Sequence, residues 1–276
     1  MKNVGITACS NGLSTSMRDN VDNLAKKLED ISLKPIFSEY IYANDSVFQG
    51  SGEQRAEALN EFYRKNNVEA VFDISGGDIA NETIPYLDFE AIGKSQIKFW
   101  GYSDLTTIIN AIYAKTGKTS VLYQIRNISK DDLRYQQFKE FFSGRSDSLF
   151  KFPYEFVSGK KMCGVIVGGN IRCFLKLAGT PYFPETNGRI LLVEALGGEI
   201  PQLVTYLSQL KMMGVFENLS GLLLGTFTKA ENRSGTDEVL MIIKQFVGDL
   251  PIIKTQFVGH GTDSCAVEIG KYYSFE

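Results

Sequence analysis

The feature that most constrains the fold is an alternation of short β-branched runs with helical patterns through the first half of the chain. Strands are predicted at residues 4–7, 34–37, 70–74 and 98–102. Helices are predicted at residues 16–31, 54–65 and 105–116, the last closed by Gly117 as a C-cap. Strands that alternate with helices form a parallel sheet covered on both faces. In such sheets the ligand site lies beyond the carboxyl ends of the strands.

The alternation lapses over residues 141–161, a serine-, glycine- and lysine-containing stretch that we interpret as a linker. Residues 1–140 then form an N-terminal α/β domain, and residues 162–276 form a C-terminal domain. In the second domain, strands are predicted at residues 162–167, 190–194, 221–226 and 251–255. Helices are predicted there at residues 200–213 and 237–246.

Composition excludes several classes of protein. Apolar residues make up 43% of the chain and charged residues 22%, as in ordinary globular proteins. The net charge of −3 gives no reason to expect nucleic acid or an anionic membrane as a partner. The start of the chain reads as a strand rather than a signal peptide. Four scattered cysteines suit a reducing cytoplasm, and with a single histidine they argue against a zinc site, so no cofactor is expected.

The single histidine, His260, is the only imidazole available as a general base, although a lone histidine in a polar loop is most often structural. Ser103 is predicted where a strand turns into a helix. Serine is a favoured N-cap and needs no other reason to be there, but the same geometry would also expose its hydroxyl as a nucleophile beside helix amides. Glu194 ends an apolar strand, where it is either solvated or able to orient an imidazole. Glu199 competes with it but fits better at the start of the following helix.

A double glycine, Gly76 and Gly77, follows the predicted strand at residues 70–74. Glycines at such a turn let backbone amides approach a ligand closely, although a plain tight turn explains most glycine pairs. A phosphate-binding loop of a kinase is a weaker interpretation, because Ile79 and Ala80 follow where a nucleotide site continues its glycine pattern.

Several short motifs along the chain are each weak evidence of function, but together they form a specific pattern. Along the chain they are SGG (residues 75–77), GYSD (101–104), GGN (168–170), LAGTPY (177–182), LVE (192–194) and GHG (259–261). In their residues and in their order along the chain, these motifs resemble those of the LD-carboxypeptidase family of serine peptidases (peptidase family S66), which includes the microcin C immunity-type peptidases. The resemblance covers nearly the whole chain.

The resemblance implies that Ser103 is the nucleophile, His260 the base and Glu194 the carboxylate that orients it. The amide of Asp104 and that of Gly76 or Gly77 would form the oxyanion hole. The implied fold is a flavodoxin-like doubly wound parallel sheet domain plus a smaller C-terminal α/β domain, with the active site in the cleft between them. A homodimer is expected on the same grounds.

The implied function is a serine carboxypeptidase that hydrolyses the L,D amide bond before a terminal D-amino acid in murein-type peptides. Ser75 stands where muropeptide-trimming members typically have arginine. Ser75 is therefore one candidate for substrate binding. Asn170 and Arg172, in the loop after the Gly168-Gly169 turn, could bind a substrate carboxylate, although Arg172 would fit equally well as a solvent-facing residue at the start of a helix. Alternatives are a microcin C immunity-type peptidase acting on peptidyl adenylate-like compounds and a non-catalytic protein that binds a ligand in the cleft.

Overall fold

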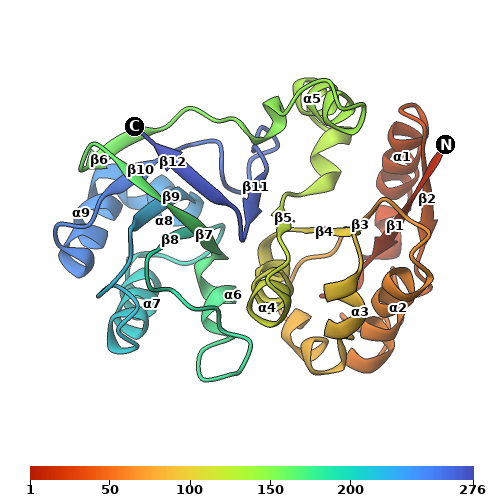
Figure 1. The fold of residues 1–276 in the computed structure, drawn as a ribbon, viewed down its shortest axis with the longest axis horizontal. Helices are drawn as coiled ribbons and strands as arrows, with labels where there is room; N and C mark the ends of the chain where they lie inside the picture. The colour runs from red at the N-terminus through yellow and green to blue at the C-terminus, as the bar shows by residue number, and fades with distance from the viewer.

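The fold consists of two α/β halves that lie side by side, each built on a six-stranded sheet (Figure 1). The computed structural model describes residues 1–276 throughout. The first half is drawn in red to yellow and the second in green to blue, with the helix α4 (Thr106–Thr116) between the sheets and α6 (Ile171–Leu175) next to it. No helix in the chain combines the length and the apolar character that crossing a bilayer requires.

The first sheet has the strand order β11-β5-β4-β3-β1-β2. All neighbours among β1 to β5 are parallel, which is the doubly wound order of flavodoxin-like domains. The predicted parallel sheet is therefore confirmed, with each predicted strand in place. The bounds are β1 (Lys2–Thr7), β2 (Leu33–Phe37), β3 (Ala70–Asp73), β4 (Lys98–Gly101) and β5 (Ser120–Leu122).

Helices cover both faces of this sheet. α1 (Arg18–Glu29) and α5 (Asp132–Phe142) pack on one face, and α2 (Gly52–Lys65), α3 (Phe89–Lys94) and α4 pack on the other. The three-residue and four-residue spacing of apolar side chains in α1 places Val21, Leu24 and Leu28 in the core. α4 ends at Gly117, whose φ of 70° is the left-handed C-cap that the sequence predicts.

The second sheet has the order β12-β7-β8-β9-β10-β6, with four parallel central strands and an antiparallel strand at each edge. Its helices pack on one face. The strands are β6 (Glu155–Ser158), β7 (Met162–Asn170), β8 (Arg189–Ala195), β9 (Gly221–Phe227), β10 (Ile252–Lys254) and β12 (Tyr272–Phe275). Besides α6, the helices are α7 (Ile200–Met212), α8 (Thr228–Ser234) and α9 (Thr236–Val247).

Two strands do not follow the domain boundaries that we expected from the sequence. β11 (Val267–Ile269) comes from the C-terminal part of the chain but pairs antiparallel with β5 in the first sheet. β6 falls within the expected linker at residues 141–161 and pairs with β10. Both strands are only three or four residues long, too short for an alternating pattern to reveal them. The C-terminal segment therefore ties the two halves together.

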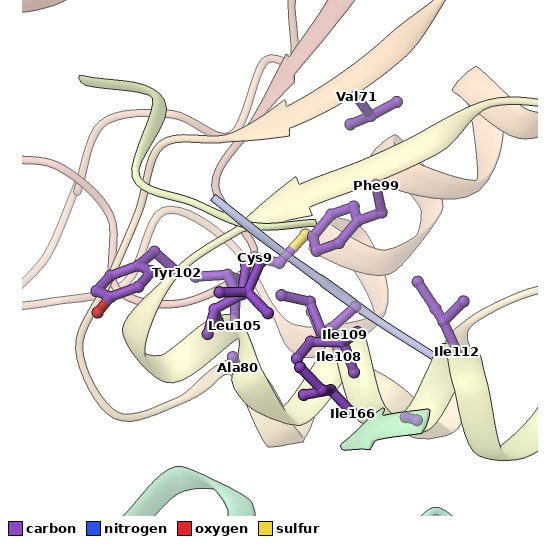
Figure 2. Close-up of a cluster of buried hydrophobic side chains, with 14 of the residues drawn as sticks. Cys9, Val71, Ala80, Phe99, Tyr102, Leu105, Ile108, Ile109, Ile112 and Ile166 are labelled. Atoms are coloured by element: carbon purple, nitrogen blue, oxygen red, sulfur yellow. The ribbon is translucent and has the colours of Figure 1, made fainter. Parts of the chain in front are cut away.

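The two halves also share one hydrophobic core. Ile166 of β7 belongs to the same buried cluster as Ile108 and Ile109 of α4, and Figure 2 shows these side chains gathered together. Polar contacts reinforce this interface, since the Asn110 side chain exchanges two hydrogen bonds of 2.9 Å with the backbone of Gly168. The relative position of the two sheets is thus fixed by packing and by hydrogen bonds at α4.

Replacing Trp100 with alanine is expected to destabilise the protein by about 3–5 kcal/mol, since a large buried side chain would leave a cavity. Trp100 is 1% exposed and lies among the rings of Phe72, Tyr123, Phe138, Phe141, Phe142 and Phe150. Urea unfolding followed by far-ultraviolet circular dichroism measures the change. Met212→Ala, at an exposed position, serves as the control and should shift stability by less than about 0.5 kcal/mol.

Candidate active site

Ser103 lies directly after β4, at the carboxyl edge of the first sheet, and opens the turn that leads into α4. Its φ of 56° is in the left-handed region, which a residue with a side chain occupies at a cost in conformational energy. Such strain in a non-glycine residue is characteristic of functional sites. Ser103 keeps part of its surface exposed, whereas the flanking Tyr102 and Asp104 are buried.

His260 faces Ser103 from the second half of the chain, with 3.2 Å between Nε2 and the serine Oγ. Its loop is held by short contacts to β9, where the Thr226 amide donates to the Val258 carbonyl at 2.8 Å. A Cβ on Gly225 would approach that carbonyl oxygen to 2.3 Å, so glycine is required for the loop to lie this close. The Gly259 carbonyl also accepts a hydrogen bond from the Ser264 hydroxyl.

Glu194 is fully buried near the end of β8, and its Oε2 is 2.8 Å from Nδ1 of His260. Neither of these two atoms has another partner in the protein. The second carboxylate oxygen, Oε1, accepts a hydrogen bond of 3.0 Å from the Asn170 side chain. The Tyr102 ring packs edge-on against the imidazole, and burial together with the nearby Glu194 raises the pKa of its hydroxyl. This arrangement can hold an imidazole in one orientation and take a proton from Ser103.

The double-glycine turn lies beside Ser103. Gly77 has a φ of 132°, and a Cβ there would lie 2.2 Å from the Asn11 side chain. None of the amides of Gly76, Gly77 and Asp104 donates to another group of the protein, but of the two glycines only Gly77 lines the pocket that holds Ser103. Gly77 is therefore better placed than Gly76 to offer a free amide, together with Asp104, to an oxyanion.

A pocket of about 520 Å³ lies between the two halves and is lined by Ser103 and Gly77, but not by His260 or Glu194. Gly77, Asp78 and Ser103 line it from the first half. From the second half it is lined by Asn170, Arg172, Ala195, Leu196, Gly197, Gly198, Glu199, Gln202, Tyr206 and Lys229. Of the expected substrate-binding residues, Asn170 and Arg172 thus reach the pocket. The Arg172 guanidinium contacts the Asp78 carboxylate and, at 3.2 Å, the Gly77 carbonyl.

Ser75 lies behind the turn rather than in the pocket. Ser75 is 1% exposed. Its hydroxyl donates to Asp73 at 2.5 Å, and the hydroxyl oxygen of Ser75 accepts a hydrogen bond from the Ser10 amide. These contacts give Ser75 a role in holding the loops after β1 and β3 and leave it no surface for a ligand. Its place next to the double glycine could not show whether its side chain faces outward or inward.

Two parts of the chain match descriptions of known domains. Residues 4–124 match the LD-carboxypeptidase N-terminal domain, and residues 163–274 match the LD-carboxypeptidase C-terminal domain. The chain belongs to the LD-carboxypeptidase family. Its class is that of a serine-type hydrolase, as expected from the sequence. No group of three or more histidine, cysteine, aspartate or glutamate side chains is arranged to hold a metal ion.

Relatives within the LD-carboxypeptidase family include both expected branches. A probable murein peptide carboxypeptidase of Bacillus subtilis is 30% identical over 257 residues, 88% of this chain and 80% of that protein. The microcin C7 self-immunity protein MccF of Escherichia coli is 27% identical over 218 residues, 66% of this chain and 62% of that protein.

Solved structures of the family show the same fold. MccF in complex with glutamyl sulfamoyl guanosine superimposes with a TM-score of 0.88 at 20% identity, covering 99% of this chain and 92% of that one. The muramoyltetrapeptide carboxypeptidase from Oxalobacter formigenes gives a TM-score of 0.82 at 21% identity, covering 99% and 94%. The two-domain α/β architecture expected from the resemblance is therefore confirmed.

Three further pocket residues were not predicted from the sequence. Gln202 and Tyr206 lie in the first two turns of α7, and Lys229 reaches the pocket from α8. Glu199 is the N-cap of α7, as its sequence context suggests, and pairs with Lys229 at 3.2 Å. The signal that could have identified this region is the Gly197-Gly198 pair after the strand that carries Glu194.

Ser103→Gly is expected to be more stable than Ser103→Ala by about 1 kcal/mol, because glycine adopts a positive φ without strain. Urea unfolding of the two variants measures the difference. The control is the same pair of substitutions at Ser16, an exposed residue of a short 3-10 helix without a positive φ, where alanine should be the more stable. A more stable alanine at position 103 would contradict strain at the serine.

Proposed function

We propose that the chain is a serine carboxypeptidase that hydrolyses the L,D amide bond before a terminal D-amino acid in murein-type peptides. The observation that carries the proposal is the alignment of Ser103, His260 and Glu194, with separations of 3.2 Å and 2.8 Å. Ser103 also lines the pocket between the two halves. The Bacillus subtilis relative, named as a probable murein peptide carboxypeptidase, supports the substrate class.

In the first step, Oγ of Ser103 attacks the carbonyl carbon of the scissile amide while Nε2 of His260 takes the hydroxyl proton. The carbonyl electron pair moves to oxygen and gives a tetrahedral oxyanion. When this intermediate collapses, the C–N bond breaks and His260 returns the proton to the leaving amine. Water then attacks the acyl-enzyme while His260 takes a proton from it. The ester bond to Ser103 breaks, His260 returns the proton to Oγ of Ser103, and the product leaves as a carboxylate.

Glu194 stabilises the imidazolium that forms in each half of the reaction. Because Glu194 is fully buried, its charge is little screened by solvent and acts strongly on Nδ1 of His260. Asn170 positions this carboxylate, since its side-chain amide donates to Oε1 while its side-chain oxygen accepts from the Cys173 amide. Asn170, which we expected to bind substrate, therefore already contributes to the site by orienting Glu194.

The oxyanion is proposed to accept hydrogen bonds from the amides of Gly77 and Asp104. Both amides lack an acceptor within the protein, and both adjoin the nucleophile or its pocket. Preorganised donors of this kind stabilise charge that develops only in the transition state, and each contributes about 10²–10³ to kcat.

The terminal carboxylate of the substrate is proposed to bind Arg172, whose side chain is 42% exposed in the pocket. Planar guanidinium groups bind carboxylates through two parallel hydrogen bonds. The substrate carboxylate would compete with Asp78, which contacts the same guanidinium. A carboxypeptidase needs a cation of this kind because its substrates end in a free carboxylate.

The alternative function, hydrolysis of peptidyl adenylate-like compounds, is favoured by one observation. Ser75 replaces the arginine typical of muropeptide-trimming members, and it is buried against Asp73. The pocket therefore gains no cation from this position. MccF, a relative of this chain, has been solved with aspartyl sulfamoyl adenosine, a compound that joins an amino acid to a nucleoside.

Release of free D-alanine from a murein tetrapeptide tests the proposal directly. The wild type should release it, and Ser103→Ala or His260→Ala should lower the rate by roughly 10⁴-fold or more. Ser16→Ala, at an exposed serine away from the pocket, is the matched control. Cleavage of a peptidyl adenylate analogue but not of the tetrapeptide would establish the alternative. Inertness toward both substrates would favour a non-catalytic binding protein.

Arg172→Ala is expected to raise KM for the tetrapeptide by 10-fold or more while changing kcat less, since a carboxylate contact present before and during reaction is lost. Steady-state kinetics with the tetrapeptide and with the same peptide amidated at its C-terminus separate the effects. The wild type should prefer the free acid, and the variant should lose that preference. If the variant keeps the preference for the free acid, Arg172 does not bind the substrate carboxylate, and its role is limited to its contact with Asp78.

A further inference from the structure

A lysine outside the pocket connects α6 to the residue that follows the nucleophile. Nζ of Lys176 is 2.5 Å from Oδ1 of Asp104 and 2.7 Å from the carbonyl oxygen of Asp78. The Asp104 side chain is fully buried and the Lys176 side chain is 18% exposed. Lys176 lies in the second half of the chain, whereas both of its partners lie in the first.

Asp104 in turn holds two further loops of the first half. Its Oδ2 accepts a hydrogen bond of 2.6 Å from the Ser10 hydroxyl and another of 2.8 Å from the Ala80 amide. Lys176 and Asp104 thus contact the segment after the double glycine at two points, Asp78 and Ala80. Gly77, whose amide is proposed to bind the oxyanion, directly precedes that segment.

We infer that Lys176 is a positioning residue for the oxyanion hole. The inference rests on the proposed function and deepens it. Removal of Lys176 would leave a buried carboxylate without its cation and free the Asp78 carbonyl, so that Asp104 and the turn at Gly77 would both relax. Their amides would then lose the alignment that transition-state stabilisation requires, since errors of about 1 Å cost roughly 10²-fold in rate.

The position of Lys176 separates this role from substrate binding. Lys176 does not line the pocket, whereas Arg172, one helical turn earlier, does. Loss of Arg172 should therefore act mainly on KM, and loss of Lys176 should act mainly on kcat. A structural role alone would lower stability and leave the chemistry of the folded enzyme unchanged.

The test uses a fluorophosphonate probe, which reports the nucleophile and the oxyanion hole without a known substrate. Oγ of Ser103 forms a bond to phosphorus and displaces fluoride, the hydroxyl proton passes to His260, and the phosphoryl oxygen occupies the oxyanion hole. Lys176→Met should lower the second-order labelling rate by about 10²-fold, the size of effect seen when one oxyanion donor is lost. Lys176→Arg should restore part of it.

The matched control is Lys98→Met. Lys98 pairs with the poorly exposed Glu268 of β11, and it begins β4 at the end of the strand opposite Ser103. This control also removes a lysine–carboxylate contact between segments from the two parts of the chain. It should lower the melting temperature while leaving the labelling rate within about twofold of the wild type.

Labelling of folded Lys176→Met within about threefold of the wild type would overturn the inference while leaving the proposed function intact. Absence of labelling in the wild type would overturn the proposed function, and the inference with it. If Lys176→Met does not fold, Asp104→Asn combined with Lys176→Met removes the unpaired charge. That double variant should still label about 10-fold or more slowly, because the Asp78 carbonyl has lost its donor, and a wild-type rate would again overturn the inference.

Discussion

The close approach of α4 to β7 is the constraint on which the rest of the site depends. Gly168 and Gly169 both have positive φ, and a Cβ on Gly169 would lie 2.7 Å from the Thr106 hydroxyl oxygen. That hydroxyl accepts a hydrogen bond from the Asn170 amide. Because α4 begins just after Ser103 and Asn170 binds Glu194, this contact helps to set the distance between Ser103 and Glu194. A side chain at Gly169 would displace the Thr106 side chain and disturb this contact.

Three buried carboxylates, Glu194, Asp104 and Asp73, lie at or near the carboxyl ends of strands, and each is compensated by a different part of the chain. Glu194 faces His260 and Asn170, Asp104 is paired with Lys176, and Asp73 accepts from the amides of Cys9 and Ser75. Burial raises the pKa of Asp73, and the hydrogen bonds from Ser75 and Cys9 oppose that effect. A buried charge is tolerated only with such partners. The loops after β1, β3, β4 and β7 are therefore fixed relative to one another by the need to satisfy these acids.

Sequence reasoning was successful where a residue's role depends on local pattern. The spacing of Val21, Leu24 and Leu28 predicts α1, which the structure contains. The residues around the GYSD motif predict that Ser103 lies at a strand-to-helix turn, and it does. Sequence reasoning failed where the role depends on distant contacts. β11 is identified only by its pairing with β5, and the inward orientation of Ser75 depends on Asp73 and Ser10. Lys176 gives no signal in the sequence, because its partner Asp104 lies 72 residues away.

The distribution of burial explains how the substrate could change in such a fold while the type of reaction is kept. Glu194 and Asp104 are fully buried, so their replacement would disturb the core as well as the chemistry. Much of the pocket wall comes instead from the turn at Gly197 and Gly198 and from the helix ends that carry Glu199 and Lys229. Loops and helix ends tolerate substitution at little cost in stability. A peptide ending in a carboxylate and an aminoacyl nucleotide could thus be distinguished by these exposed residues alone, with Ser103 as the proposed nucleophile for both.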